Sequence, residues 1–257
     1  MRLIRIIPLL MIKDNNLYKS KQFKDFNYIG DIYNAVKIFS EKKAHEIILL
    51  DVDASNNKKK FNIDLIKKIR QEIFIPLTVG GGINNIDDVS NLIENGVEKV
   101  SINSAFHFNK RLVEEISQKY GSQSTTVSID VKKINDEYRA FILNGKKMID
   151  THLIELLKKA EGDGAGEILL TNIDKEGMQS GYDIELYQNI QNSISIPIIA
   201  HGGCKNLSSI NHLFENTSIT TAAASSFFVY YGSRNAVLIN YPLSEDIDVI
   251  MDNFKQI

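Results

Sequence analysis

The sequence predicts an α/β fold in one domain: a single (β/α)8 (TIM) barrel with a two-fold half-barrel repeat, covering residues 1–257. Three observations predict this fold. Short apolar runs alternate with amphipathic helical stretches almost from end to end, which is typical of a parallel sheet covered by helices. The chain has the usual length of one such barrel. Several landmarks also recur at a constant offset of about 121 positions, as two half-barrels would require.

Eight apolar runs are the expected barrel strands, and amphipathic stretches such as residues 31–44 are the expected covering helices. The strands are expected at Arg5–Met11, Glu46–Asp51, Pro76–Gly80, Lys99–Asn103, Thr126–Asp130, Glu167–Thr171, Pro197–His201 and Thr220–Ala224. Right-handed crossovers between parallel strands allow such a sheet to close. An open, doubly wound sheet is the alternative, because it too is built from βα units.

The internal repeat favours the closed barrel over the open sheet. The matched landmarks are Glu46 with Glu167, Pro76 with Pro197, Gly81-Gly82 with Gly202-Gly203, and Ser104 with Ser225. Two segments interrupt the alternation. Residues 15–30 read as an irregular loop after the first strand and are a candidate lid, because the active-site loops of barrels follow strands. Residues 134–150 read as a β-hairpin turned at Asn144-Gly145.

Composition argues against several classes of partner. The net charge of −2 speaks against nucleic acid, because phosphate-backbone binding needs clustered positive charge. The apolar N-terminal stretch is interrupted by Arg5 and Pro8 and is too short to span a membrane. Cys204 is the only cysteine, so no intrachain disulfide can form. No His/Asn pair that could activate it as a nucleophile is placed near it in the sequence. We expect a cytoplasmic protein without metal or cofactor.

Two glycine runs predict anion binding. Gly80-Gly81-Gly82 and Gly202-Gly203 fall where strands should end, and glycine lets backbone N–H groups approach an anion without a Cβ in the way. Each run is paired with a serine that precedes an expected helix start. The predicted sites are a first grip made of Gly82, Asn103 and Ser104, and a second grip made of Gly203, Ala224 and Ser225. Two grips on opposite sides of one barrel predict an elongated ligand with two phosphates.

Candidate catalytic groups are carboxylates at strand ends. Asp130 ends the fifth strand, and a carboxylate at the carboxyl end of a barrel strand indicates catalysis rather than structure. Asp51 closes the second strand and has a weaker claim. Met11 stands at the corresponding end of the first strand, where a charged group would be expected if chemistry takes place beside it.

Four charged residues begin strands at the opposite end of the barrel. These residues, named here the floor ring, are Arg5, Glu46, Lys99 and Glu167. Side-chain alternation puts Arg5 on the same face as Met11, Lys99 on that of Asn103 and Glu167 on that of Thr171, and the four charges balance. Buried charges are costly unless they are paired. A structural salt-bridge ring and a functional gate are both open interpretations of these residues alone.

As a set, these residues resemble the cyclase subunit of imidazole glycerol phosphate synthase, the synthase half of a glutamine amidotransferase in histidine biosynthesis. The similarity runs from Arg5 to Phe228. It rests on Lys13-Asp14, Lys19, LDVDAS at 50–55, PLTVGGGI, EKVSINSA, GSQ at 121–123, VSID, GAGEILLT and QSGYD ending at Asp183. The resemblance implies a heterodimer with a class I glutaminase under the floor. Ammonia would pass the floor ring as a gate and rise to a bis-phosphate substrate, with Lys19 on one phosphate.

One departure from that family bears directly on catalysis. The resemblance implies a general acid/base pair of aspartates at the ends of the first and fifth strands, and Met11 replaces the first of them. A thioether cannot carry a proton, and general acid–base catalysis contributes about 10²–10⁴-fold to a rate. Other departures expected at the same mouth are Ser20, Glu176, Met178 and His201.

A complete floor below an altered mouth resembles the cyclase-like proteins of surface-polysaccharide pathways, which act with a glutaminase and a separate sugar amidotransferase. The strings RIIPLLMIKD, FNYIGDIYNAVKIFSEK and AVLINYP are similar to that branch. The resemblance implies a subunit that receives or relays ammonia for amidation of a surface sugar. The alternative is a functional cyclase/lyase in which Asp130, with Asp51 or Glu176, covers for Met11. A stand-alone sugar-phosphate isomerase would need an aspartate at Met11 and has no use for the floor ring.

Overall fold

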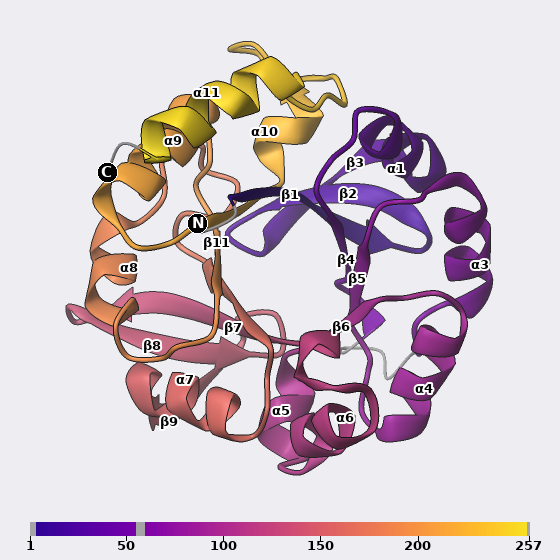
Figure 1. Ribbon diagram of the computed structural model, residues 1–257, viewed down its shortest axis with the longest axis vertical. Coiled ribbons are helices and arrows are strands. Elements are labelled where there is room, and N and C mark those ends of the chain that lie inside the picture. Colours follow the sequence, from indigo (N-terminus) through magenta and orange to yellow (C-terminus); the bar gives the residue numbers. More distant parts are fainter. Residues whose placement is uncertain (1–3, 55–59, 256–257) are drawn as a thin grey trace.

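The computed structural model describes residues 4–54 and 60–255, and in it eight parallel strands close into a barrel (Figure 1). Each strand pairs in parallel with both neighbours, and the β7–β10 pairing completes the ring. All eight predicted strands are confirmed, with ends shifted by four residues at most. They are β1 (Arg5–Lys13), β4 (Ile47–Asp51), β5 (Leu77–Gly80), β6 (Lys99–Ile102), β7 (Thr125–Ile134), β10 (Glu167–Asn172), β11 (Ile198–His201) and β12 (Thr221–Ala224).

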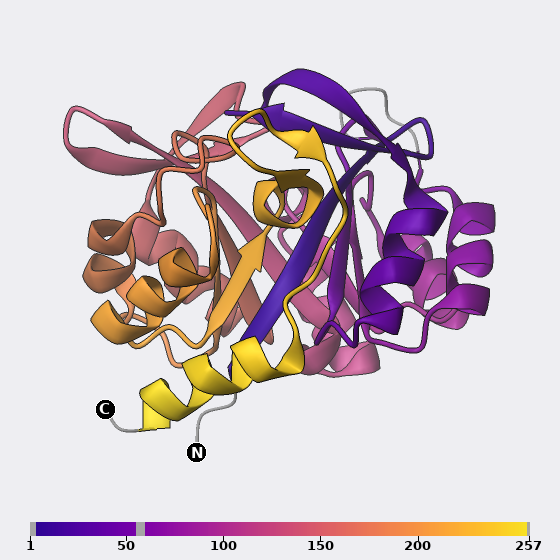
Figure 2. The ribbon, with the colours of Figure 1, turned by 90° about the horizontal axis from the view of Figure 1, so that it is seen from above.

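Helices form the outer ring around these strands (Figure 1). Several begin at an Asp or Asn whose side chain accepts a backbone N–H of the first turn, as in α1 with Asp31 and α3 with Asn62. The helices are α1 (Ile32–Glu41), α3 (Ile63–Glu72), α4 (Ile86–Glu94), α5 (Ser104–Phe108), α6 (Leu112–Tyr120), α7 (Leu153–Gly162), α8 (Ile184–Ile190), α9 (Leu207–Asn216), α10 (Ser226–Val229) and α11 (Ser244–Lys255), with a 3-10 turn at Ser122–Ser124. One apolar stripe of each long helix packs on the strands, and α11 lies beside α9 on the outer rim (Figure 1), at the bottom edge of the barrel (Figure 2).

The candidate lid at residues 15–30 is an ordered β-hairpin, so its interpretation as an irregular loop was wrong. Strand β1 continues past the barrel and turns at Asp14 and Asn15, both at positive φ. It then pairs antiparallel with β2 (Asn16–Lys21), which pairs with β3 (Lys24–Asp31). Register shifts within the hairpin bury Lys19 and Ser20 in succession, which destroys the alternation that identifies a strand. We call β2–β3 the lid.

The second irregular segment contains two turns rather than the one predicted. Strand β7 extends to Ile134 and turns at Asn135-Asp136 into β8 (Glu137–Ile142). The predicted turn at Asn144-Gly145 then leads to β9 (Lys147–His152). The sequence prediction missed the extension of β7, because Lys132 and Lys133 end its apolar run. A short hairpin of β13 (Tyr230–Tyr231) and β14 (Ala236–Val237) follows α10. The lid and the β8–β9 extension both lie at the top edge of the barrel (Figure 2).

Equivalent glycines in the two halves adopt the same strained geometry. Gly81 has φ +105° and Gly202 has φ +102°. A Cβ at Gly81 would collide with the carbonyl oxygen of Asp51, and one at Gly202 with that of Asn172. The two obstructing carbonyls are themselves 121 positions apart, which supports the predicted half-barrel repeat. Only glycine tolerates both the φ angle and the close approach.

Candidate functional site

The four charged residues of the floor ring meet at the bottom of the barrel, as the sequence predicted. Arg5 bonds Glu46 at 3.2 Å and Glu167 at 2.6 Å, and Lys99 bonds the same two carboxylates at 2.9 and 2.6 Å. Charges therefore alternate around a closed ring. Hydroxyls of Thr78 and Thr126 supply further hydrogen bonds to the carboxylates.

The ring is close to electrostatic balance, with its carboxylates buried and its cations partly exposed below. Burial alone would raise the pKa of Glu167, but the charges and hydrogen bonds of Arg5 and Lys99 outweigh it, so the pKa is lowered. Breaking such a ring requires parting a charge from two partners. The four ion pairs therefore close the barrel floor.

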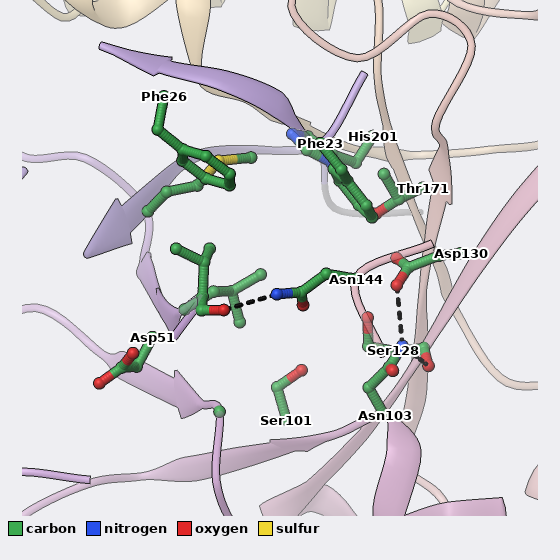
Figure 3. A pocket seen from close by; sticks show the side chains of 14 residues that line it. Phe23, Phe26, Asp51, Ser101, Asn103, Ser128, Asp130, Asn144, Thr171 and His201 are labelled. Carbon is green, nitrogen blue, oxygen red and sulfur yellow. Dashed lines mark hydrogen bonds between the residues drawn. The ribbon is translucent and has the colours of Figure 1, made fainter. Parts of the chain in front are cut away.

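A pocket of about 660 Å³ lies at the opposite end of the barrel, within the carboxyl ends of the strands. We call it the mouth pocket (Figure 3). Its polar wall includes Ser101, Asn103, Ser128, Asp130 and Thr171, and Asp51 lies on the side opposite Asp130. Its other wall is apolar and is made of Met11, Phe23, Phe26, Leu50 and Val52.

Asp130 is suited to proton transfer near neutral pH. Its side chain is buried at the end of β7's barrel portion, and burial raises its pKa to about 7 although hydrogen bonds from Asn103 and Thr171 oppose the shift. The Asn103 amide donates to Oδ2 over 3.0 Å. A group with a pKa near the working pH is the most effective general acid or base. The interpretation of Asp130 as the catalytic residue remains a prediction that this environment supports.

Met11 faces Asp130's pocket from β1 but is packed in an apolar environment. It is 3% exposed and belongs to the inner barrel core with Leu9 and Ile48. The Ser20 hydroxyl lies 3.3 Å from its Sδ and 3.0 Å from Oε2 of Glu176, and the carboxylate is the stronger acceptor for its one proton. The Met11 side chain itself therefore supplies no proton carrier to the pocket.

Asp51 is committed to local structure. Its Oδ1 accepts the backbone N–H groups of Asp53 and Ala54 at 2.9 and 3.0 Å, which fixes the turn after β4. Burial raises its pKa, and these two hydrogen bonds oppose that shift. Ser55, the last residue of the LDVDAS motif, lies outside the described residues.

The three residues of the first grip gather around a cavity of about 960 Å³ that adjoins the mouth pocket. Gly82 has φ +70° and lines this cavity. Ser104 donates to Oδ1 of Asn103 over 3.2 Å and accepts the Leu143 N–H. Helices begin at or just after both serines, as expected, but α5 has five residues and α10 has four. Helices this short contribute little at their N-termini, so the glycine backbone is the stronger anion-binding feature.

The second grip is filled by the protein's own side chains. Gly203, Ala224 and Ser225 line a cavity of only about 200 Å³ together with Lys19 and Glu176. Lys19 forms a buried ion pair with Glu176, and burial lowers the lysine pKa. The Glu176 carboxylate also accepts the Phe23 N–H at 3.2 Å, so it fastens the lid over this grip. Lys19 thus lies beside the second grip, but its partner here is a carboxylate.

Residues missed by the sequence analysis roof the mouth pocket. Phe23 and Phe26 come from the lid, and Asn144 reaches from the β8–β9 turn to donate to the Val52 carbonyl over 2.6 Å (Figure 3). The predicted Asn144-Gly145 turn was the only signal for this contact. The aromatic pair gave none, since residues 15–30 lacked a strand pattern.

Cys204 is an inert thiol, in agreement with the sequence analysis. It is buried, and burial raises its pKa to about 12, so almost none is thiolate at neutral pH.

Among the described residues no group of three or more His, Cys, Asp or Glu side chains is placed to hold a metal ion. Within the same residues, no helix combines the length and apolarity needed to cross a membrane.

Comparison with known proteins agrees with this architecture. Residues 5–234 match the family model described as histidine biosynthesis protein. A Hydrogenobaculum sp. protein named imidazole glycerol phosphate synthase subunit HisF is 42% identical over 87% of this chain and 89% of its own length. A Pseudomonas aeruginosa protein whose name assigns it provisionally to the same synthase as subunit hisF2 is 40% identical, over 95% of this chain and 98% of its own length. A Leptospira borgpetersenii protein, provisionally named subunit HisF, is 42% identical over 96% and 98%. The chain therefore belongs to the histidine biosynthesis protein family and is similar to its HisF subunits.

Proposed function

We propose that this chain is the ammonia-receiving synthase subunit of a glutamine amidotransferase. It docks a class I glutaminase on the barrel floor and passes ammonia upward to a phosphorylated small molecule at the mouth. The observation that carries this proposal is the floor ring, where four charges close one end of a barrel that an apolar plug would close more simply.

The barrel interior is suited to the passage of a small neutral molecule. Between the floor ring and the mouth pocket the inner core is apolar and consists of Ile7, Leu9, Met11, Ile48, Leu169, Ile199 and Ala223. Ammonia carries no charge and can enter such a core, whereas ammonium would lose its hydration at a large cost. The ring would have to open at one salt bridge for each molecule that enters, and Lys99, partly exposed at the floor, is the member we expect to move.

The test is a coupled assay with a glutaminase recovered from the native host by pull-down. Lys99→Ala should leave glutamine hydrolysis in the complex but reduce the share of ammonia delivered to the acceptor. Arg70→Ala, which removes a partly exposed pair with Glu98, is the matched control and should leave coupling nearly unchanged. A chain that binds no glutaminase and alters none would contradict the proposal.

Two acceptors are compatible with the mouth. Production of imidazole glycerol phosphate is supported by the named relatives and by the environment of Asp130. Amidation of a surface-polysaccharide sugar is supported by Met11, which leaves the mouth without the second proton carrier. The relatives are the stronger argument for the class of reaction, and Met11 is the stronger argument against a full rate of cyclisation. An ammonia-dependent cyclase assay and complementation of a histidine auxotroph separate the two.

The ligand of either reaction is proposed to bind through its phosphates. Crystals grown with phosphate or sulfate should show an anion at the first grip, near Gly82 and Ser104. An anion at the second grip, near Gly203 and Ser225, would have to displace Glu176 from Lys19. Anions bound only at other places would remove the bis-phosphate interpretation.

A further inference from the structure

The second grip contains a carboxylate and a cation that belong to the protein itself. Glu176, on the loop after β10, and Lys19 of the lid form a buried ion pair at the wall of this cavity, and each residue is at most 3% exposed. The second carboxylate oxygen, Oε2, accepts the Ser20 hydroxyl at 3.0 Å and the Phe23 N–H at 3.2 Å. Three donors therefore hold the Glu176 carboxylate in place.

The backbone ties the same loop to the lid. The Glu176 carbonyl accepts the Gln22 N–H at 2.9 Å. The next residue, Gly177, approaches the lid so closely that a Cβ there would collide with the Ser20 carbonyl oxygen. The Glu176 side chain therefore cannot leave the second grip without giving up its lid contacts, and the loop that carries it is itself fastened to the lid.

The wall of the second grip carries no net charge. Among the residues that line this cavity, all within the described part of the chain, Lys19 is the only side chain that is a cation at neutral pH, because burial lowers the pKa of His201 to about 3. The charges of Lys19 and Glu176 sum to zero whichever of the two holds the proton between them. A phosphate at this grip would find its cation already neutralised, and burying an anion without a counter-charge is costly.

The first grip differs from the second in space and in charge. Its cavity measures about 960 Å³, against about 200 Å³ for the second, and no Asp or Glu of the described residues lines it. The 121-residue repeat matches Glu176 with Ser55, whose side chain carries no charge and which lies outside the described residues. The first grip is therefore the better site for a phosphate.

The second grip still offers hydrogen bonds to an uncharged group. Ser226 lines its cavity and is 5% exposed, and among the described residues its hydroxyl has no hydrogen-bond partner. The neighbouring Ser225 donates to the Leu9 carbonyl over 2.7 Å, which leaves its oxygen free to accept. Both grips adjoin the mouth pocket, since Asn103 lines the pocket and the first grip and His201 lines the pocket and the second. One ligand can therefore reach both grips.

We propose that Glu176 is a specificity-determining residue that excludes phosphate from the second grip, so that this site takes a ligand with one phosphate. The phosphate binds at the first grip, and an uncharged polar end, such as the hydroxyls of a sugar, lies at the second. This inference rests on the proposed function in treating the first grip as a phosphate site. It narrows the ligand from a bis-phosphate to a sugar monophosphate.

The experiment is a titration of the nitrogen-15-labelled protein with inorganic phosphate, followed by NMR of the backbone amides. In the wild-type protein the amide signals of Gly82 and Ser104 should move and saturate. Those of Gly203 and Ser225, at the second grip, should stay in place over the same range. The wild-type titration can overturn the proposal by itself, because saturable shifts at both grips would show that Glu176 does not exclude phosphate.

Glu176→Gln is the variant that should open the second grip. Glutamine keeps the length of the side chain and one oxygen to accept from Ser20 and Phe23, but it removes the negative charge beside Lys19. Phosphate should then bind at the second grip at least about tenfold more tightly than in the wild-type protein, because a like charge no longer opposes it. A Glu176→Gln variant that is folded and still binds phosphate only at the first grip would overturn the proposal.

Two further variants make the result specific. Glu185→Gln removes a negative charge from an exposed pair with Lys133 and should open no second site. Adding Lys19→Met to Glu176→Gln should abolish the gained site, because the freed cation is then missing. These readouts involve neither a glutaminase nor ammonia, so failure of the coupled assay leaves the inference standing. Absence of wild-type shifts at both grips would remove the phosphate ligand from the proposed function and this inference with it.

Discussion

The floor and the mouth of this barrel treat charge in opposite ways. At the floor every charge of the ring has two opposite partners within 3.2 Å. At the mouth a single buried carboxyl, Asp130, faces a wall of Met11 and two phenylalanines. A gate needs balanced charges that can part and re-form, whereas acid–base chemistry needs proton carriers on both sides of a ligand. The floor has the paired charges that the proposed gate needs, and the mouth has one of the two proton carriers that the proposed cyclisation needs.

The largest effect is expected in cyclase turnover. With free ammonia the purified chain should convert the histidine-pathway substrate at least about 10²-fold more slowly than a cyclase with both aspartates, because Met11 cannot carry a proton. Met11→Asp should recover only part of that loss, since Ser20, Glu176 and His201 also differ near the site. Robust turnover, or growth of a cyclase-deficient histidine auxotroph that carries the unmodified chain, would show that the mouth does not lack a proton carrier and would contradict this comparison of floor and mouth.

A smaller but still large effect is expected where the lid is fastened. Glu176→Ala leaves the buried Lys19 ammonium without its partner and should lower the free energy of unfolding by about 3–5 kcal/mol. The lid should also lose amide protection at Phe23, whose N–H bonds Glu176. Chemical denaturation and hydrogen exchange measure the two. Lys175→Ala, at the neighbouring residue, serves as the control, and equal losses in both variants would show that the ion pair does not fasten the lid.

The floor should respond less, because its cations are partly exposed. Glu46→Ala removes one carboxylate from Arg5 and Lys99 but leaves Glu167 to both, so we expect a loss near 3 kcal/mol, the low end for a buried pair. Glu72→Ala, at an exposed pair with Lys37, should cost under about 1 kcal/mol. Thermal unfolding of the two variants checks the difference. Similar costs would mean that the floor ring is no more than a surface network.

The smallest effect, counted per pH unit, is a pH dependence of stability that originates at Asp130. The folded pKa of Asp130, about 7, lies above its ordinary value of 3.8, so its contribution to stability is fully present below about pH 4 and is lost as pH rises to 7. The slope is at most about 1.4 kcal/mol per pH unit. Asp130→Asn should remove this slope between pH 4 and 7. If the free energy of unfolding changes with pH equally in the wild-type protein and in Asp130→Asn, the titrating group lies elsewhere.

Local sequence patterns predicted most of the fold and part of the site. The eight strands were predictable because each is an apolar run between helical periods, and the 121-residue repeat located both glycine runs. The lid was not predictable, because its register shifts bury Lys19 and Ser20 side by side and remove the alternation. The apolar roof of Phe23 and Phe26 was missed for the same reason.

What the sequence determined by itself was therefore the set of groups at each end of the strands: the floor ring, the two glycine runs, Asp130, and the absence of a carboxylate at Met11. Strand parity and the repeat are local properties, and they suffice for such assignments. What only the tertiary structure decided was which of these groups meet. The pairing of Lys19 with Glu176 joins residues 157 positions apart, and the bond from Ser225 to Leu9 joins residues 216 apart. Contacts of that separation exist only after barrel closure brings β12 beside β1 and the lid over both, because burial then forces each polar group to find a partner.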